Sequence, residues 1–94
     1  MANVKQTQIE TKTGFKVSID KSVLDDMELL ELLSEMSSGT PEGTMKLPGV
    51  IEKILGAGDK KRLYDHLRTR DGRVPVSMVE TELKEIIAGL NEKK

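Results

Sequence analysis

The sequence contains no cysteine and no tryptophan, and its only aromatic residues are Phe15 and Tyr64. Without cysteine, the chain has neither a disulfide framework nor a thiolate for catalysis or metal binding. The core must therefore consist of leucine, isoleucine, valine and methionine, of which the five methionines adapt best to irregular packing.

Long apolar runs are also missing. No stretch approaches the roughly 20 apolar residues that a membrane-spanning helix needs. The N-terminal sequence MANVKQTQIE lacks the apolar segment of a signal peptide. We therefore expect a cytoplasmic protein that is not a membrane protein, in keeping with the absence of cysteine.

Neither sign of charge dominates, since 15 Lys and Arg stand against 16 Asp and Glu, but the charges are unevenly distributed. Residues 20–42 hold seven acids and one base, whereas residues 43–75 hold eight bases and four acids. Such asymmetry can support intramolecular docking, self-association or binding of a charged partner. The plainest interpretation of most of these charges is a solvated helix face.

The length predicts one small domain, residues 1–94. Phe15, Val17 and Ile19 alternate with polar residues, which predicts a hairpin pairing roughly residues 4–11 with residues 15–19. Four helices should follow, at about residues 23–36, 45–55, 60–69 and 77–90. The predicted fold class is mainly α: a small four-helix domain with an N-terminal β-hairpin (α+β). It divides into the hairpin at 1–21, a helical part at 22–90 and a frayed tail at 91–94.

The helix boundaries are predicted from capping and breaking residues. Ser22 is expected to cap the first helix and Asp59 the third, while Ser77 and Glu80 fit a capping box at the fourth. Gly56 is expected to end the second helix. The predicted core consists of the following residues: Phe15, Val17, Ile19, Leu29, Leu33, Val50, Ile51, Ile54, Leu63, Leu67, Val79, Leu83, Ile86 and Ile87.

The segment DDMELLELLSEM at residues 25–36 has an unusual pattern. On a helical wheel its leucines and methionines cover a sector roughly 200° wide, far more than one core-facing stripe requires. This helix is either central and packed on several sides, or it has a second apolar face for a partner. The central position is the simpler interpretation for a domain of this size.

The sequence has few side chains in arrangements suited to catalysis or to ligand binding. His66 is the only histidine, and with no serine in a nucleophile context we interpret it as a surface residue rather than a general base. Asp25, Asp26 and Glu28 lack the spacing of a calcium loop and suit the N-terminus of a helix. The sequence GAGD at residues 56–59 lacks the spacing of a phosphate-binding loop. We predict no catalytic residue, no cofactor and no metal.

A basic segment, residues 60–73, offers the best candidate nucleic-acid contact because several cations along one segment can neutralise phosphates. Against it stand the near-neutral net charge and the lack of aromatic residues for base stacking. A small nucleic-acid-binding or regulatory accessory protein is therefore the alternative function. The candidate contacts are Lys60, Lys61, Arg62, Arg68, Arg70 and Arg73.

The elements follow one another in a distinctive order: a hairpin with TGFKVSID, an acidic helix with DDMELLELLSE, an apolar helix ending in LG, a basic helix with LYDHLR, the break DGRVP and a closing helix with VETELKEII. This order resembles the small tail assembly chaperones of long-tailed phages and prophages of Gram-positive bacteria. The resemblance runs from about residue 13 to residue 90. Met27 stands where that pattern has an aromatic residue.

The resemblance implies a non-enzymatic function in the cytoplasm of a host bacterium. Such chaperones bind the long helical tape-measure protein, keep its apolar surface from aggregating, and are displaced as tail-tube subunits assemble. The implied partners are the tape-measure protein or another tail protein, with self-association as a means of adding many weak contacts. We hypothesise that Met27, Leu30 and Leu33 contact a client helix or a neighbouring copy. The competing interpretation buries all three in the core.

Overall fold

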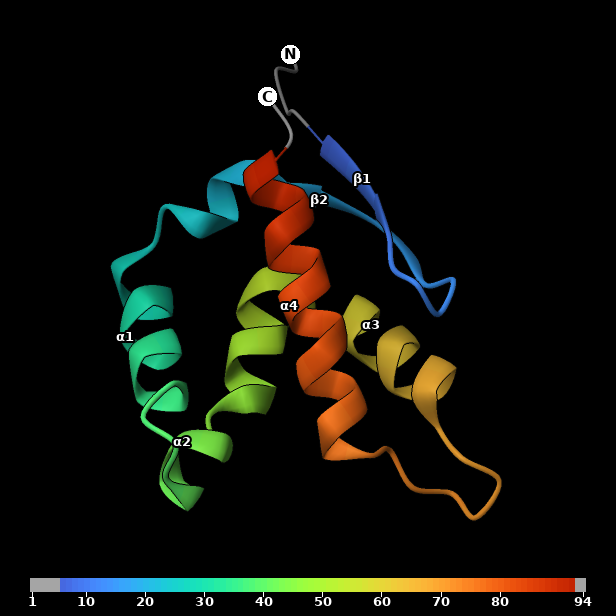
Figure 1. Cartoon of the computed structure of the whole chain (residues 1–94). Coiled ribbons are helices and arrows are strands. Elements are labelled where there is room, and N and C mark those ends of the chain that lie inside the picture. The colour runs from blue at the N-terminus through green and yellow to red at the C-terminus, as the bar shows by residue number, and fades with distance from the viewer. Residues whose placement is uncertain (1–5, 93–94) are drawn as a thin grey trace.

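A computed structural model describes residues 6–92. Strands β1 (Gln6–Glu10) and β2 (Lys16–Asp20) form the predicted antiparallel hairpin, with Ile9 opposite Val17. Residues 4 and 5 of the predicted first strand lie outside the described residues. The hairpin turn is closed where the Thr11 N–H donates to the Phe15 carbonyl, and Figure 1 shows the hairpin beside the helices, at one edge of the molecule.

Helix α1 (Met27–Met36) begins later than predicted. A 3-10 turn, Lys21–Leu24, comes first, and the Asp20 carboxylate accepts from the Ser22 N–H. The Asp26 carboxylate then accepts from the first backbone N–H groups of α1. The prediction of a Ser22 cap was therefore wrong, because aspartates occupy both positions where a side-chain oxygen can reach the exposed N–H groups.

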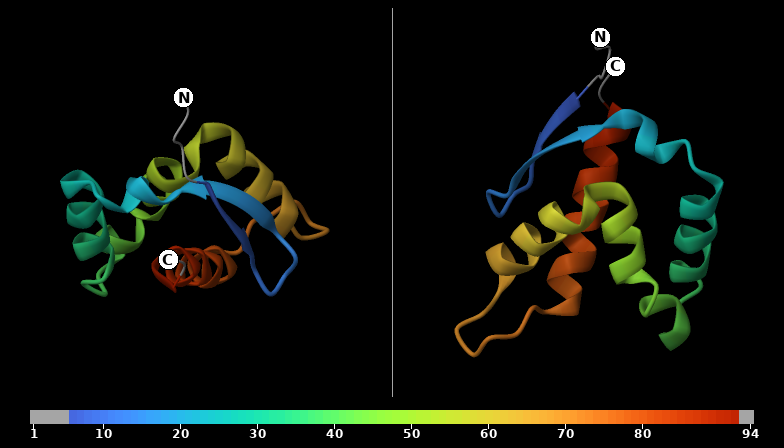
Figure 2. Two further views of the ribbon diagram at one scale, coloured as in Figure 1. Left: turned by 90° about the horizontal axis from the view of Figure 1, so that it is seen from above. Right: turned by 180° about the vertical axis from the view of Figure 1, so that it is seen from behind.

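The predicted helices at 45–55 and 60–69 are the two limbs of α3 (Leu47–Leu67), and the non-helical Gly56 separates them, as predicted. Gly56 has φ 84° and ψ 162°, a conformation that glycine adopts without the strain of a side chain. Asp59 lies inside α3 and pairs with Arg62, so it is no cap. Figure 2 shows the two limbs of α3 at an angle to each other.

The predicted count of four helices was slightly off, because two of them are joined as the limbs of α3, and the mainly helical class is correct. Residues 6–92 form three main helices, α1, α3 and α4 (Val76–Glu92), and a single-turn helix, α2 (Pro41–Thr44), in the segment expected to be a loop. Helix α4 begins at Val76, so Ser77 lies inside it and not at its N-cap. The helix also includes residues 91 and 92 of the tail expected to fray, and the remaining two residues lie outside the described range.

Helix α3, not α1, occupies the centre: it packs against α1, α4, β2 and the 3-10 turn. Helix α1 lies at the edge of the molecule (Figure 1). Every residue of the predicted core is buried except Leu33 and Ile87, which are partly buried. Among residues 6–92, the prediction omitted six buried residues: Ile9, Thr11, Gly43, Leu47, Glu82 and Leu90. Within the described residues, no helix combines the length and apolar character that a membrane crossing requires.

The approach of α2 to the end of α1 depends on glycine at position 43. A Cβ atom there would lie 2.1 Å from the Glu35 carbonyl oxygen, so the backbone would have to move. We expect Gly43→Ala to lower the free energy of unfolding by about 1–3 kcal/mol. Gly58→Ala is the matched control, because its Cβ meets no atom within 4 Å and alanine favours a helix by up to about 1 kcal/mol. Urea denaturation measures the free energy of unfolding of both variants. Equal midpoints for Gly43→Ala and the parent protein would contradict the close packing of α2 on the end of α1.

Candidate functional site

The exposed apolar surface of α1 answers the question raised by its broad leucine pattern. Met27 is 69% exposed and Leu30 is 52% exposed, whereas Leu29 is fully buried. Successive helical residues are 100° apart, so Leu29 points to the core while Leu30 and Met27 point away from it. Leu33 lies between the two directions and is half-buried. The helix therefore has a core stripe and a second, outward stripe.

A groove lies beside this outward stripe, between α1 and α4. It has a volume of about 640 Å³ and apolar walls formed by Leu33 and Met36 of α1 and by Leu83 and Ile87 of α4. Its polar lining comes from Ser37, Glu80, Lys84 and Asn91. Of the three residues predicted to bind a partner, Leu33 lines the groove, while Met27 and Leu30 lie on the exposed side of the same helix. We call Met27, Leu30, Leu33 and this groove the α1 surface.

Ion pairs connect α1 to the first limb of α3 and to Lys46, the residue before it. Lys53 Nζ lies 3.5 Å from Asp26 Oδ2 and 3.3 Å from Glu28 Oε1, and Lys46 Nζ lies 3.3 Å from Glu35 Oε1. These pairs are exposed, so each contributes little to stability alone. The backbone N–H of Leu29, helped by that of Glu28 and by Lys53, lowers the pKa of Asp26. Two of the three carboxylates considered for a cation site, Asp26 and Glu28, are thus occupied in capping and in pairing with Lys53.

The basic segment at 60–73 does not form one cationic face. Lys60 pairs with Glu52 across the Gly56 kink, at 2.7 Å, and this hydrogen bond lowers the pKa of Glu52. Arg62 pairs with Asp59 and lies over the Phe15 ring, with 5.0 Å between the guanidinium carbon and the ring centroid. Lys60 therefore connects the two limbs of α3, and Arg62 contacts the hairpin.

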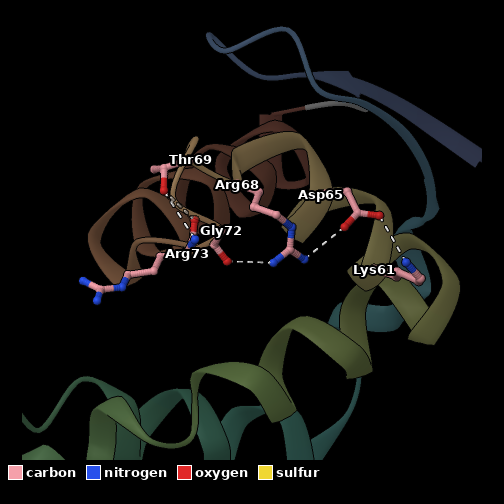
Figure 3. Close-up of polar contacts among 6 residues, drawn as sticks. All are labelled: Lys61, Asp65, Arg68, Thr69, Gly72 and Arg73. Atoms are coloured by element: carbon pink, nitrogen blue, oxygen red, sulfur yellow. Dashed lines mark hydrogen bonds and ion pairs between the residues drawn. The ribbon is translucent and has the colours of Figure 1, made fainter.

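Asp65 accepts hydrogen bonds from two further cations, Lys61 at 3.2 Å and Arg68 at 3.0 Å (Figure 3). The Arg68 hydrogen bond is the main cause of the lowered pKa of Asp65. Arg70 and Arg73 alone among the six predicted contacts have no ion pair within residues 6–92. Four of the six candidate phosphate contacts are therefore already paired with acids.

A polar cluster that the sequence analysis missed joins the hairpin turn to the helices. The Thr13 hydroxyl donates to Glu82 Oε2 at 2.8 Å and lies 3.0 Å from His66 Nε2, and the Lys12 N–H donates to Glu85 Oε1. Glu82 is only 1% exposed, and its Oε1 has no hydrogen-bond partner among the described residues. The signal in the sequence was the position of Glu82 on the apolar side of α4, close on the helical wheel to buried residues of the same face.

The geometry of this cluster anchors the hairpin rather than activating a nucleophile. Because the Thr13 hydroxyl donates to a carboxylate, His66 Nε2 is positioned to donate to Thr13 and not to remove its proton. The His66 ring also packs on Phe15, with 5.5 Å between ring centroids. In the part of the chain that the structure describes, no three His, Asp or Glu side chains gather in a way that could hold a metal ion.

Comparison with protein-family models, curated proteins and solved structures found no match to this chain.

Two adjacent leucines test the division of α1 into a core stripe and an outward stripe. Leu29→Ala removes a fully buried side chain and should lower the free energy of unfolding by about 2–5 kcal/mol. Leu30→Ala removes an exposed side chain and should change it by about 0.5 kcal/mol or less. Chemical denaturation of both variants provides the measurement. Similar losses for the two variants would mean that Leu30 is part of the core.

Acid titration tests the Asp26 cap. The pKa of Asp26 is below the ordinary value of 3.8 in the folded protein, so its stabilising contribution is present above that value and is lost as the pH falls through the lowered folded pKa. Asn can still accept the N–H hydrogen bonds but does not titrate. We expect the unfolding free energy of Asp26→Asn to fall less than that of the parent between about pH 5 and about pH 2. Identical pH dependence of the two proteins would show that the cap is not linked to titration.

Proposed function

We propose that this protein is a non-enzymatic assembly chaperone that binds a helical client through the α1 surface. The observation that supports this most directly is the exposure of Met27 and Leu30 on the outer side of α1, next to the groove that Leu33 borders. Contiguous exposed apolar surface on a small protein commonly marks a site of protein interaction.

The shape and chemistry of the α1 surface suit a helix. A client helix with apolar residues at positions i, i+3, i+4 and i+7 can lay its stripe along a groove between two helices. Ala88 of α4 is small and exposed at the groove, which permits close approach of a partner backbone. Methionines 27 and 36 have flexible side chains, and such residues accommodate clients of varied sequence.

The resemblance to phage tail assembly chaperones supports the tape-measure protein as the client. A long helical protein of this kind repeats its apolar stripe along its length, so several chaperone copies can bind it and their weak contacts add up. The chaperone would act in the bacterial cytoplasm during assembly of the tail of a phage or prophage.

The alternative, binding of nucleic acid by the basic segment, has less support. Lys60, Lys61, Arg62 and Arg68 are paired with acids, so each would have to exchange an existing partner for a phosphate. Salt dependence separates the two functions, because phosphate contacts weaken steeply with added salt and apolar contacts do not.

The test measures binding of a labelled amphipathic peptide of about 20 residues, long enough to form a helix, by fluorescence anisotropy. We expect Leu30→Glu to weaken binding by at least about tenfold, because a charge would enter the apolar contact. Ala57→Glu is the matched control, since it adds the same charge at an exposed position of α3 outside the α1 surface. Binding to the parent protein should persist at high salt.

Circular dichroism shows whether each variant is folded, so that a loss of binding can be told from a loss of structure. A folded Leu30→Glu variant that binds the peptide as well as the Ala57→Glu control would overturn the proposal. An unfolded Leu30→Glu variant would support the competing interpretation, that Leu30 belongs to the core. Tight, salt-sensitive binding of an oligonucleotide, with no peptide binding, would favour the alternative function.

A further inference from the structure

A second apolar groove lies away from the α1 surface, between the two limbs of α3 and the beginning of α4. It has a volume of about 310 Å³. Met45 and Pro48 line it near the start of the first limb, Tyr64 lines it on the second limb, and Val74 and Val76 line it where the chain enters α4. No residue of this groove lines the groove between α1 and α4. The kink at Gly56 creates this space, because it turns the second limb away from the first (Figure 2).

Apolar side chains at this groove are exposed to solvent. Met45 is 76% exposed and Val76 is 53% exposed. The volume is enough to accept one or two large side chains of a partner rather than a whole helix. Tyr64 provides an aromatic wall, and aromatic residues often dominate the binding energy of small interfaces.

Two arginines, Arg70 and Arg73, lie in the loop that leads from α3 into the groove, whereas the other four cations of the basic segment are paired with acids. Arg73 directly precedes Val74 of the groove, and the Arg73 side chain points away from the Arg68–Asp65 pair (Figure 3). Neither Arg70 nor Arg73 has an acidic partner among the described residues, and the Asp71 carboxylate accepts a hydrogen bond from the Thr69 hydroxyl. An arginine guanidinium binds a carboxylate through two parallel hydrogen bonds, which lysine cannot do.

We propose that this groove binds a peptide segment of a partner protein in which large apolar residues are flanked by acidic residues. The apolar side chains occupy the space between Met45, Tyr64 and Val76. The flanking carboxylates pair with Arg70 and Arg73. This site is independent of the α1 surface and adds a second partner to a protein whose first proposed partner is a client helix.

The experiment uses labelled synthetic peptides whose core of leucine and phenylalanine is flanked by pairs of glutamates, with a lysine-flanked peptide of the same core as the control. Fluorescence anisotropy should show at least about tenfold tighter binding of the glutamate-flanked peptide. Val76→Glu should weaken its binding by at least about tenfold, and Arg73→Glu should abolish the preference for glutamate flanks. Leu30→Glu should have no effect, which separates this proposal from the proposed function.

Both Met45 and Val76 are exposed, so Met45→Glu provides a second variant if Val76→Glu fails to fold. Equal affinity for the two peptides would overturn the proposal, as would loss of binding on Leu30→Glu alone. A second copy of the chain as the occupant would also overturn it. That outcome would appear as a concentration-dependent dimer in sedimentation, dissociated by Val76→Glu, with no peptide binding.

Discussion

The change of direction at Gly56 is the constraint on which the remaining packing depends. A straight helix of the same 21 residues would be about 32 Å long. Such a helix could not contact both α1 with its first half and the hairpin with its second half. The first limb holds α1 through Lys53, while the second limb holds the hairpin through Arg62 and His66. The hydrogen bond between Lys60 and Glu52 connects the limbs across the kink. Both surfaces proposed to bind partners follow from this geometry, since the kink sets α1 apart at one edge and opens a groove between the limbs.

The position of α1 leaves one stripe of the helix in the core and another exposed. A central helix would bury its whole circumference, but α1 packs mainly on the first limb of α3 and the short α2. Leu29 contributes to the core, whereas more than half of Met27 and of Leu30 is exposed. Exposed apolar side chains promote aggregation, and a client helix of the proposed kind would cover these two. Glu31, which follows Leu30 on this helix, keeps a charge at the same surface.

The hairpin has a polar attachment as well as an apolar one. Ile9 packs so closely on α4 that a Cβ at Gly89 would lie 3.3 Å from it. Beside this contact, the Glu82 carboxylate lies out of solvent and accepts one hydrogen bond from Thr13. A buried carboxylate is costly, and it restricts the hairpin to arrangements that bring a donor to it. Apolar packing holds the hairpin against the helices, and the polar cluster selects its register on α4.

Local patterns in the sequence determined the hairpin, the helical character of the rest and most of the core. Alternation with period two and stripes with period 3.6 depend only on neighbouring residues, so Val17, Ile51 and Ile86 could be assigned to the core from the sequence. The break at Gly56 was predicted, because glycine readily adopts a positive φ, but the angle between the two limbs of α3 was not. The choice between two positions for α1 also required the tertiary structure. Whether Leu30 is buried depends on which element lies opposite it, and that contact joins residues far apart in the chain. Glu82 and Thr13 illustrate the same limit, since they are 69 positions apart and only the folded chain brings them together.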